Sequence, residues 1–213
     1  MFTEFVDGPF WYFSATVFVV GVLWRLLAIF RAGNLHDLAP SRAPGFPGAV
    51  RMTFRRFIVH REFLRPAGLH VIAGYMFHIG LFALLFFAAP HVEFYKERIF
   101  GFGWPTLPHW AFVLAADFAF AGLLLLWLHR LLHPVRRLIS NVDDHIASIL
   151  VFLVMLTGCM ALFESFDPLR VIHYFLAELL LIYFPFSSLM HTFTFVLSRG
   201  FTGSTYAHHG VDA

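Results

Sequence analysis

Histidines inside long apolar segments are the side chains of this chain whose type and spacing could do chemistry. His70 and His78 lie in one such segment, and His173 and His191 lie in another. A histidine within a membrane-spanning segment is energetically costly and usually functional. Its imidazole is a common ligand of metal ions, including the iron of haem. The four side chains therefore predict an iron-containing cofactor held between two segments of the chain.

The spacing of His173 and His191 favours two such centres. The residues are 18 apart, which is five full turns of a continuous α-helix and a rise of about 27 Å. Both imidazoles would then leave one face of the helix, with one near each membrane surface. Two haems stacked across a bilayer need this arrangement, and each iron takes its second ligand from a facing helix. Ligation by two histidines suits electron transfer rather than oxygen binding, because it leaves no open position on the iron.

The facing ligands admit more than one assignment. His70 and His78 differ by about 12 Å in rise and about 80° around a helix, so they share a broad face. If His70 lies at the depth of His191, then His78 pairs with His173, and this requires tilted helices or a tilted haem. In a second pairing His78 faces His191, and His173 must find His91 or no partner. A simpler alternative is that hydrogen bonds between helices, or water, satisfy four unrelated histidines.

The elements that position these residues follow from the composition. Of the 213 residues 59% are hydrophobic and only 13% are charged, and the mean hydropathy is +0.74. Soluble proteins carry about 25% charged residues, so the chain is predicted to be an all-α integral membrane protein. A helix needs roughly 20 apolar residues to cross a bilayer. Five segments qualify: residues 10–30, 67–89, 109–128, 146–163 and 171–197.

The single cysteine, Cys159, excludes some classes of site. An internal disulfide, an iron–sulfur cluster held by cysteines and a CxxCH haem attachment site all need more cysteines.

Lysine and arginine placement predicts the orientation. The first and third connections are rich in arginine, with Arg31, Arg42, Arg51, Arg55, Arg56, Arg61, Arg65, Arg130, Arg136 and Arg137. The second and fourth connections hold only Lys96, Arg98 and Arg170, beside Glu93, Glu97, Glu164 and Asp167. Because basic connections stay in the cytoplasm, we expect a protein of the bacterial inner membrane whose N-terminus lies outside and whose C-terminus lies in the cytoplasm.

The basic connection between residues 31 and 66 has two interpretations. It either sets the topology and touches anionic lipid, or it forms a docking surface for a cytoplasmic partner. Within it, the stretch APSRAPGFPG is rich in Pro and Gly, so we expect irregular structure that needs something to pack on.

Several motifs together resemble one known family. They are YFPFSSLMH ending at His191, LRVIH ending at His173, FHIG containing His78, HRLLHPVRR with DDHIASIL after it, and GVLWRL. They are similar to segments of the membrane gamma subunit of respiratory nitrate reductase, which is a five-helix cytochrome b with two haems. The resemblance covers nearly the whole chain, so residues 1–213 are expected to form one such transmembrane domain. It implies that His78, His173 and His191 are axial ligands of haem b.

The chain departs from this family at one ligand. The family's second ligand on helix two lies some three turns beyond FHIG, where this chain has Phe87, Ala88 and Ala89. Either His70 joins His78, or the outer haem has another ligand, or only one haem is bound. We adopt the first alternative, with haem b ligated by His70, His78, His173 and His191. The departure indicates a divergent relative, of the kind that serves hydrogenase-linked, heterodisulfide-reductase-like and sulfur-metabolism complexes.

The resemblance also implies a function. The chain would transfer electrons between quinol or quinone and a cytoplasmic iron–sulfur subunit, while a catalytic subunit performs the terminal reaction. Its other contacts would be with membrane lipid, and no nucleic acid is involved. The chain itself would be the quinol-oxidising subunit of an oxidoreductase complex.

Three further residues bear on this function. Glu178 is an intramembrane carboxylate, so it is a candidate for the proton path of quinol oxidation, or else a protonated acid hydrogen-bonded across helices. Lys96 falls loosely in the region where the family binds quinol. Pro185 removes a backbone hydrogen bond and is predicted to kink the fifth helix.

The rival hypothesis is a transporter or membrane scaffold without a cofactor. In it Glu178, Asp117 and the histidines form a proton or ion path. The paired spacing of His173 and His191 argues against this rival, because a transporter has no reason to place ligands one haem-to-haem distance apart.

Overall fold

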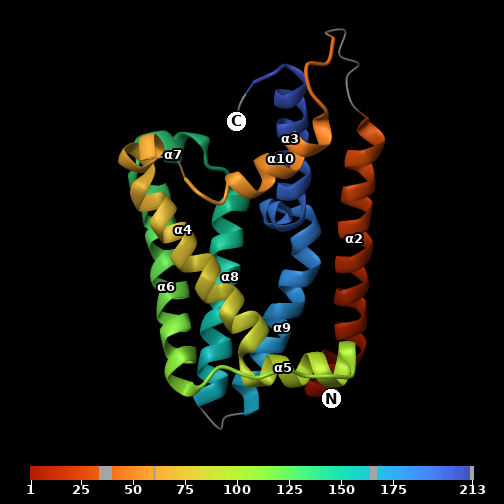
Figure 1. Ribbon diagram of the computed structural model, residues 1–213. Helices are drawn as coiled ribbons and strands as arrows, with labels where there is room; N and C mark the ends of the chain where they lie inside the picture. Colours follow the sequence, from red (N-terminus) through yellow and green to blue (C-terminus); the bar gives the residue numbers. More distant parts are fainter. Residues whose placement is uncertain (34–39, 60, 164–166, 212–213) are drawn as a thin grey trace. The chain divides into compact units, whose positions relative to one another are not determined.

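Every regular element of the described residues is a helix (Figure 1). The computed structural model describes residues 1–33, 40–59, 61–163 and 167–211. Within these ranges, five helices are long and apolar enough to cross a membrane: Phe2–Ala32, Ala67–Phe87, His109–Leu132, Val142–Leu162 and Pro168–Phe186. Each overlaps one of the five predicted segments, although the fifth span ends at Phe186 and not at residue 197. The predicted fold class, an all-α membrane protein with five transmembrane helices, is confirmed.

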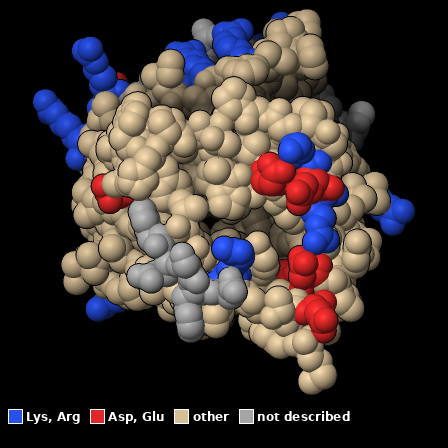
Figure 2. All heavy atoms as spheres, turned by 90° about the horizontal axis from the view of Figure 1, so that it is seen from below, with Lys and Arg blue, Asp and Glu red and all other residues tan. Residues whose placement is uncertain are grey.

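The surface has the composition that a lipid environment requires. Large apolar side chains such as Val20, Trp24 and Ile79 are more than half exposed. In the view of Figure 2 most of the surface is uncharged, and the acidic and basic side chains gather in small groups. Exposed apolar side chains are favourable against lipid tails and unfavourable in water. The chain is therefore a multi-pass membrane protein.

The helices form two compact units. The first contains residues Met1–His60 and Arg170–Ala213, and the second contains Arg61–Leu169. The first unit is built from α1 (Phe2–Phe5), η1 (Val6–Phe10), α2 (Trp11–Ala32), α3 (Gly45–Arg55), most of α9 (Asp167–Tyr183), η3 (Phe184–Phe186), η4 (Ser188–Met190) and α10 (His191–His208). The second is built from α4 (Arg61–Phe87), α5 (Ala89–Tyr95), η2 (Lys96–Phe100), α6 (His109–Leu132), α7 (Pro134–Ile139) and α8 (Val142–Phe163).

Small residues bring α4 and α6 together in the second unit. A side chain added at Gly122 of α6 would place its Cβ 2.7 Å from the Ala73 carbonyl oxygen and 2.8 Å from Phe77 Cα. One added at Gly80 of α4 would lie 2.6 Å from the Ala119 nitrogen. Backbones that approach so closely are typical of membrane helix pairs. The contacts define the face of α4 that meets α6.

The basic connection contains a helix, which corrects part of the sequence prediction. Irregular structure is found at residues 40–44, but α3 begins at Gly45 and continues to Arg55. Its Gly48 lies against the backbone of Gly203 in α10, so closely that neither position has room for a Cβ. The expected packing partner therefore exists, and it is α10. Helix propensity does not predict α3, because Gly and Pro are poor helix formers. Here glycine instead permits the close contact with α10.

The fifth predicted helix is interrupted, which is a second correction. α9 ends at Tyr183, two 3₁₀ turns follow, and α10 begins at His191. Pro185 is fully buried, and a Cβ added at Gly21 of α2 would lie 2.6 Å from Pro185 Cβ. Ser187 is extended, with φ −114° and ψ 174°, and its side chain accepts a hydrogen bond from Leu189 N. The kink expected at Pro185 is a complete break, so the five-turn relation between His173 and His191 does not apply.

Candidate functional site

The four predicted ligands are divided between the two units. His70 and His78 lie on α4 of the second unit, while His173 lies on α9 and His191 opens α10 in the first. The hydrogen bonds and ring contacts described for these four histidines are made with other residues. Each histidine therefore has its own surroundings.

His78 is held in one tautomer by the backbone. Its Nδ1 lies 2.7 Å from the carbonyl oxygen of Gly74, one turn earlier in α4. A carbonyl oxygen only accepts hydrogen bonds, so Nδ1 carries the proton and Nε2 carries the lone pair. Histidines that ligate metals almost always donate their other ring N–H in this way, which fixes the ring and raises its basicity. The rings of Phe77 and Phe82 flank the imidazole at 4.9 and 6.1 Å between centroids.

His191 has the same arrangement at the start of α10. Its Nδ1 lies 2.8 Å from the carbonyl oxygen of Ser188, in the turn that follows the helix break. In the 3₁₀ turn of Ser188–Met190 the same carbonyl also accepts from the backbone N–H of His191, so both the backbone and the ring of His191 are directed at Ser188. The donor chemistry of His78 and His191 fits axial ligation of haem iron through Nε2.

His173 lies within α9, where its ring is half-buried and 6.2 Å from that of Tyr174. Glu178 follows five residues later and is only 4% exposed. Among the described residues, no hydrogen-bond partner is present for its Oε2 atom. A buried carboxyl oxygen without a hydrogen-bond partner lowers the stability of the fold, so its presence indicates a functional role for the side chain.

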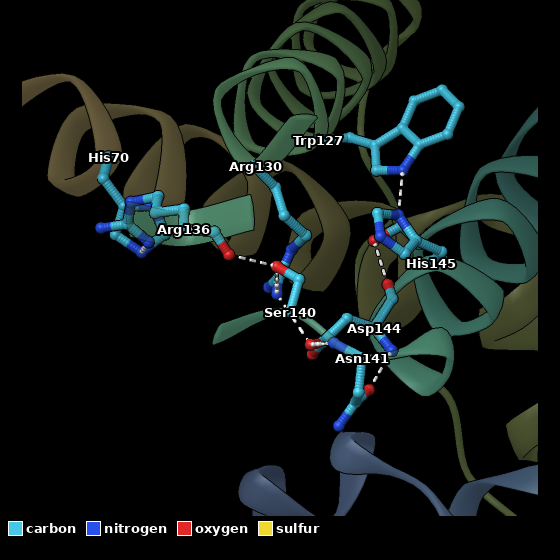
Figure 3. A network of polar contacts seen from close by, with 9 residues as sticks. His70, Trp127, Arg130, Arg136, Ser140, Asn141, Asp144 and His145 are labelled. Atoms are coloured by element: carbon cyan, nitrogen blue, oxygen red, sulfur yellow. Dashed lines mark hydrogen bonds and ion pairs between the residues drawn. The ribbon is translucent and has the colours of Figure 1, made fainter. Parts of the chain in front are cut away.

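His70 differs from His78 and His191. Its Nε2 faces the Nη1 of Arg136 at 3.4 Å, and arginine can only donate, so the Nε2 lone pair points at a guanidinium. Its Nδ1 is buried and has no hydrogen-bond partner in the described part of the chain. The ring also packs against that of His129, with centroids 6.2 Å apart. His70 therefore belongs to a polar cluster at one end of the second unit (Figure 3).

This cluster continues into a network that the sequence reading missed (Figure 3). Arg130 of α6 forms an ion pair with Asp144 of α8 at 2.9 Å and donates to Ser140 Oγ at 3.1 Å. Asn141 and Asp144 exchange backbone-to-side-chain hydrogen bonds of 3.1 and 3.0 Å, which is a capping box for the start of α8. The Asn-x-x-Asp spacing before an apolar run was the signal that could have revealed it. The network ties together the ends of α6, α7 and α8.

His91, which the sequence offers only as an alternative ligand, is hydrogen-bonded to carbonyl oxygens of α4. Its Nδ1 lies 2.9 Å from the Leu84 carbonyl oxygen and 3.1 Å from that of Leu85. Burial lowers the pKa of the imidazole, although the two hydrogen bonds act in the opposite direction. His91 is therefore neutral at physiological pH, with its proton on Nδ1.

Lys96 is exposed and paired. Its Nζ donates to Glu93 Oε1 at 2.9 Å, and this hydrogen bond, with the carboxylate charge, raises the pKa of Lys96. The ammonium is thus charged at the connection between α5 and η2. Among the described residues there is no group of three or more His, Cys, Asp or Glu side chains able to hold a metal ion without a prosthetic group.

Comparison with known proteins gives a relative but no function. No protein-family model matches the chain, and no solved structure matches it. A protein of Nitratidesulfovibrio vulgaris strain Hildenborough, described only as "Protein", is 31% identical over 211 residues. The similarity covers 95% of this chain and 92% of the relative. The chain belongs to the same family as this Nitratidesulfovibrio vulgaris protein, a family to which that description assigns no activity.

Proposed function

We propose that the chain is a membrane cytochrome b subunit that passes electrons between quinol and a cytoplasmic partner. The observation that carries the proposal is the shared state of His78 and His191. Each lies in a motif that resembles an axial-ligand segment, and each donates Nδ1–H to a backbone carbonyl, at 2.7 and 2.8 Å. Nε2 is thereby prepared as a ligand on both rings. Bound haem b would supply a one-electron redox centre at each of two sites, and His173 with one further histidine would complete the four ligands.

The remaining residues would act on protons and on the partner. Glu178, buried five residues beyond His173, would accept a proton as quinol is oxidised near the outer surface. The arginine-rich connections would lie in the cytoplasm. Arg51 and Arg55 of α3 and Arg56 just after it are exposed, and α3 packs closely against α10. This rigid basic surface would receive an iron–sulfur subunit, and the terminal reaction would belong to a catalytic subunit beyond it.

The haem content of the purified chain tests the proposal. We expect a red preparation in which the pyridine haemochrome assay gives about two b haems per chain, because four histidines provide two ligand pairs. His208 and His209, in the C-terminal part of α10 and just after it, provide the matched control, and replacing both by alanine should leave the ratio unchanged. A colourless protein, produced in a host that makes haem b, would support the transporter or scaffold instead.

Charge reversal at Arg55 and Arg56 tests the partner surface. We expect R55E/R56E to weaken co-purification of the soluble partner subunits by about tenfold or more, because each close charge pair at an interface contributes roughly 1 kcal/mol or more. The haem spectrum should not change, since both side chains are exposed at the end of α3. Arg98→Glu, in the second connection, is the control and should leave assembly intact. Equal recovery of partners with both variants would reduce the connection to a topology signal.

A further inference from the structure

We propose that a pocket between α3 and α10 binds the phosphate group of an anionic phospholipid. The pocket lies within the first unit and has a volume of about 410 Å³. It is lined by two arginines, two hydroxyl side chains and one apolar side chain, which are Arg56, Arg199, Ser198, Thr202 and Met52. This site goes beyond the proposed function, because it requires a membrane around the chain but no haem.

The crossing of α3 and α10 brings the two arginines to one pocket (Figure 1). Gly48 of α3 lies against the backbone of Gly203 of α10. On α3, Met52 comes one turn after Gly48, and Arg56 comes one turn after Met52, so the three share a face. On α10, Arg199 comes one turn before Gly203. Both arginines therefore lie on the same side of the glycine contact, and the buried Met52 lines the pocket between them.

The guanidinium of Arg199 is positioned by two aromatic rings and a backbone carbonyl. Its Cζ atom lies 4.8 Å from the ring centroid of Phe57 and 5.2 Å from that of Phe195. Its Nη1 donates a hydrogen bond of 3.4 Å to the carbonyl oxygen of Thr53. Among the contacts with described residues, this arrangement leaves the N–H groups of Nε and Nη2 for a ligand. Their planar fork fits two oxygens of one phosphate group.

Arg56 reaches the same pocket from α3. Its Nε donates to the Sδ atom of Met52 at 3.2 Å, which leaves its two Nη groups to donate to a ligand. Arg55 and Arg51 leave the helix about 100° and about 140° away from Arg56. They remain on the exposed face that is proposed to receive a partner subunit, whereas Arg56 is at the edge of that face and also faces α10.

The pocket contains two positive charges without a counter-charge from its own helices. Neither residues 40–61 nor residues 179–211 contain an Asp or a Glu. In the described part of the chain, no carboxylate forms an ion pair with Arg56 or Arg199. Charged side chains in a membrane protein are costly unless they are paired, and Arg199 is half-buried. A bound phosphate would remove this cost, and it could also accept a hydrogen bond from the exposed Ser198 hydroxyl.

The surface beside the pocket favours a lipid as the source of the phosphate. Phe46, Val50 and Phe54 recur at every fourth residue of α3, and all three are exposed, so they form an apolar stripe along the helix. A helix with such a stripe and with arginines on another face lies at the boundary between lipid headgroups and acyl chains. Basic pockets between membrane helices at this depth bind anionic headgroups. Contact of lipid with the basic connection alone would not involve α10, which contributes three of the lining residues.

Native mass spectrometry of the full-length chain in detergent, titrated with phosphatidylglycerol, tests the proposal. We expect one tightly bound phosphatidylglycerol per chain. Arg199→Gln and Arg56→Gln should each weaken its binding by about tenfold, because each removes charge-assisted hydrogen bonds to the phosphate. Arg31→Gln, near the end of α2, removes the same charge outside the pocket and should bind as the wild type does. If Arg199→Gln fails to fold because the aromatic contacts are lost, Arg56→Gln decides, since its described hydrogen bond is with Met52 alone.

Inorganic phosphate and phosphatidylcholine identify what the pocket recognises. Inorganic phosphate should not displace the bound phosphatidylglycerol, because it makes no contact with the apolar stripe. Phosphatidylcholine should bind more weakly, because its choline group adds a positive charge beside the two arginines. Displacement by inorganic phosphate would indicate a site for a free anion, and equal binding of phosphatidylcholine would indicate a groove that does not recognise charge. Either result overturns the proposal, as does wild-type affinity in both arginine variants.

Discussion

Replacing His191 and His173 singly by alanine is expected to remove different haems. His191→Ala should abolish electron transfer to the cytoplasmic partner while leaving one haem that a quinol analogue still reduces. His173→Ala should block reduction by the quinol analogue, whereas dithionite still reduces the haem that remains. The reason is their separation: about 15 Å of α9 follows His173, and two 3₁₀ turns come before His191. A redox titration of each variant shows which of the two potentials disappears.

The control for this pair is His208→Ala, near the C-terminal end of α10. It should keep both potentials and both electron-transfer steps. If His173→Ala and His191→Ala remove the same redox component, or if neither removes one, then these two histidines do not ligate separate haems and the cytochrome assignment fails at its centre.

Glu178→Gln is expected to slow quinol oxidation on the order of 10²-fold, the low end of what one acid–base group contributes. The amide keeps the shape of the side chain but cannot accept the proton that quinol releases. Haem content and optical spectra should stay as in the wild type, because the substitution changes neither the size nor the position of the side chain. Stopped-flow measurement of haem reduction by a quinol analogue, compared with reduction by dithionite, isolates the proton-dependent step.

Asp117→Asn is the matched control, because Asp117 is also a carboxyl within a membrane span but is exposed on α6. Its quinol oxidation rate should be unchanged. A wild-type rate in Glu178→Gln would mean that Glu178 is a protonated acid hydrogen-bonded between helices, with no part in the proton path.

The helical architecture could be predicted because it depends on long apolar runs. Each of the five candidate spans overlaps a segment that composition alone marks as membrane-spanning, since lipid allows no alternative to a helix for an isolated apolar run. The surroundings of individual histidines could not be predicted in the same way. The contact between His70 and Arg136 joins residues 66 positions apart, and no local pattern encodes it.

Two local structures escaped prediction for a physical reason that they share. α3 and the break at Phe184–Met190 both depend on a glycine in another helix. Gly203 admits α3 to the surface of α10, and Gly21 leaves room for Pro185. The proline removes one backbone hydrogen bond of the helix, and this loss is compatible with a kink as well as with a complete break. Only the surface of α2 decides between them.

The contact between Gly48 and Gly203 has a mechanical consequence. No side chain cushions the two backbones, so α3 and α10 must move as one body, and interiors packed in this way transmit displacement rather than absorb it. His191 is the first residue of that body, whereas His173 belongs to α9 on the far side of the break. A displacement of α3 at its exposed arginines therefore moves the His191 imidazole directly. The turns at Pro185 and Ser187 can bend before the displacement reaches His173.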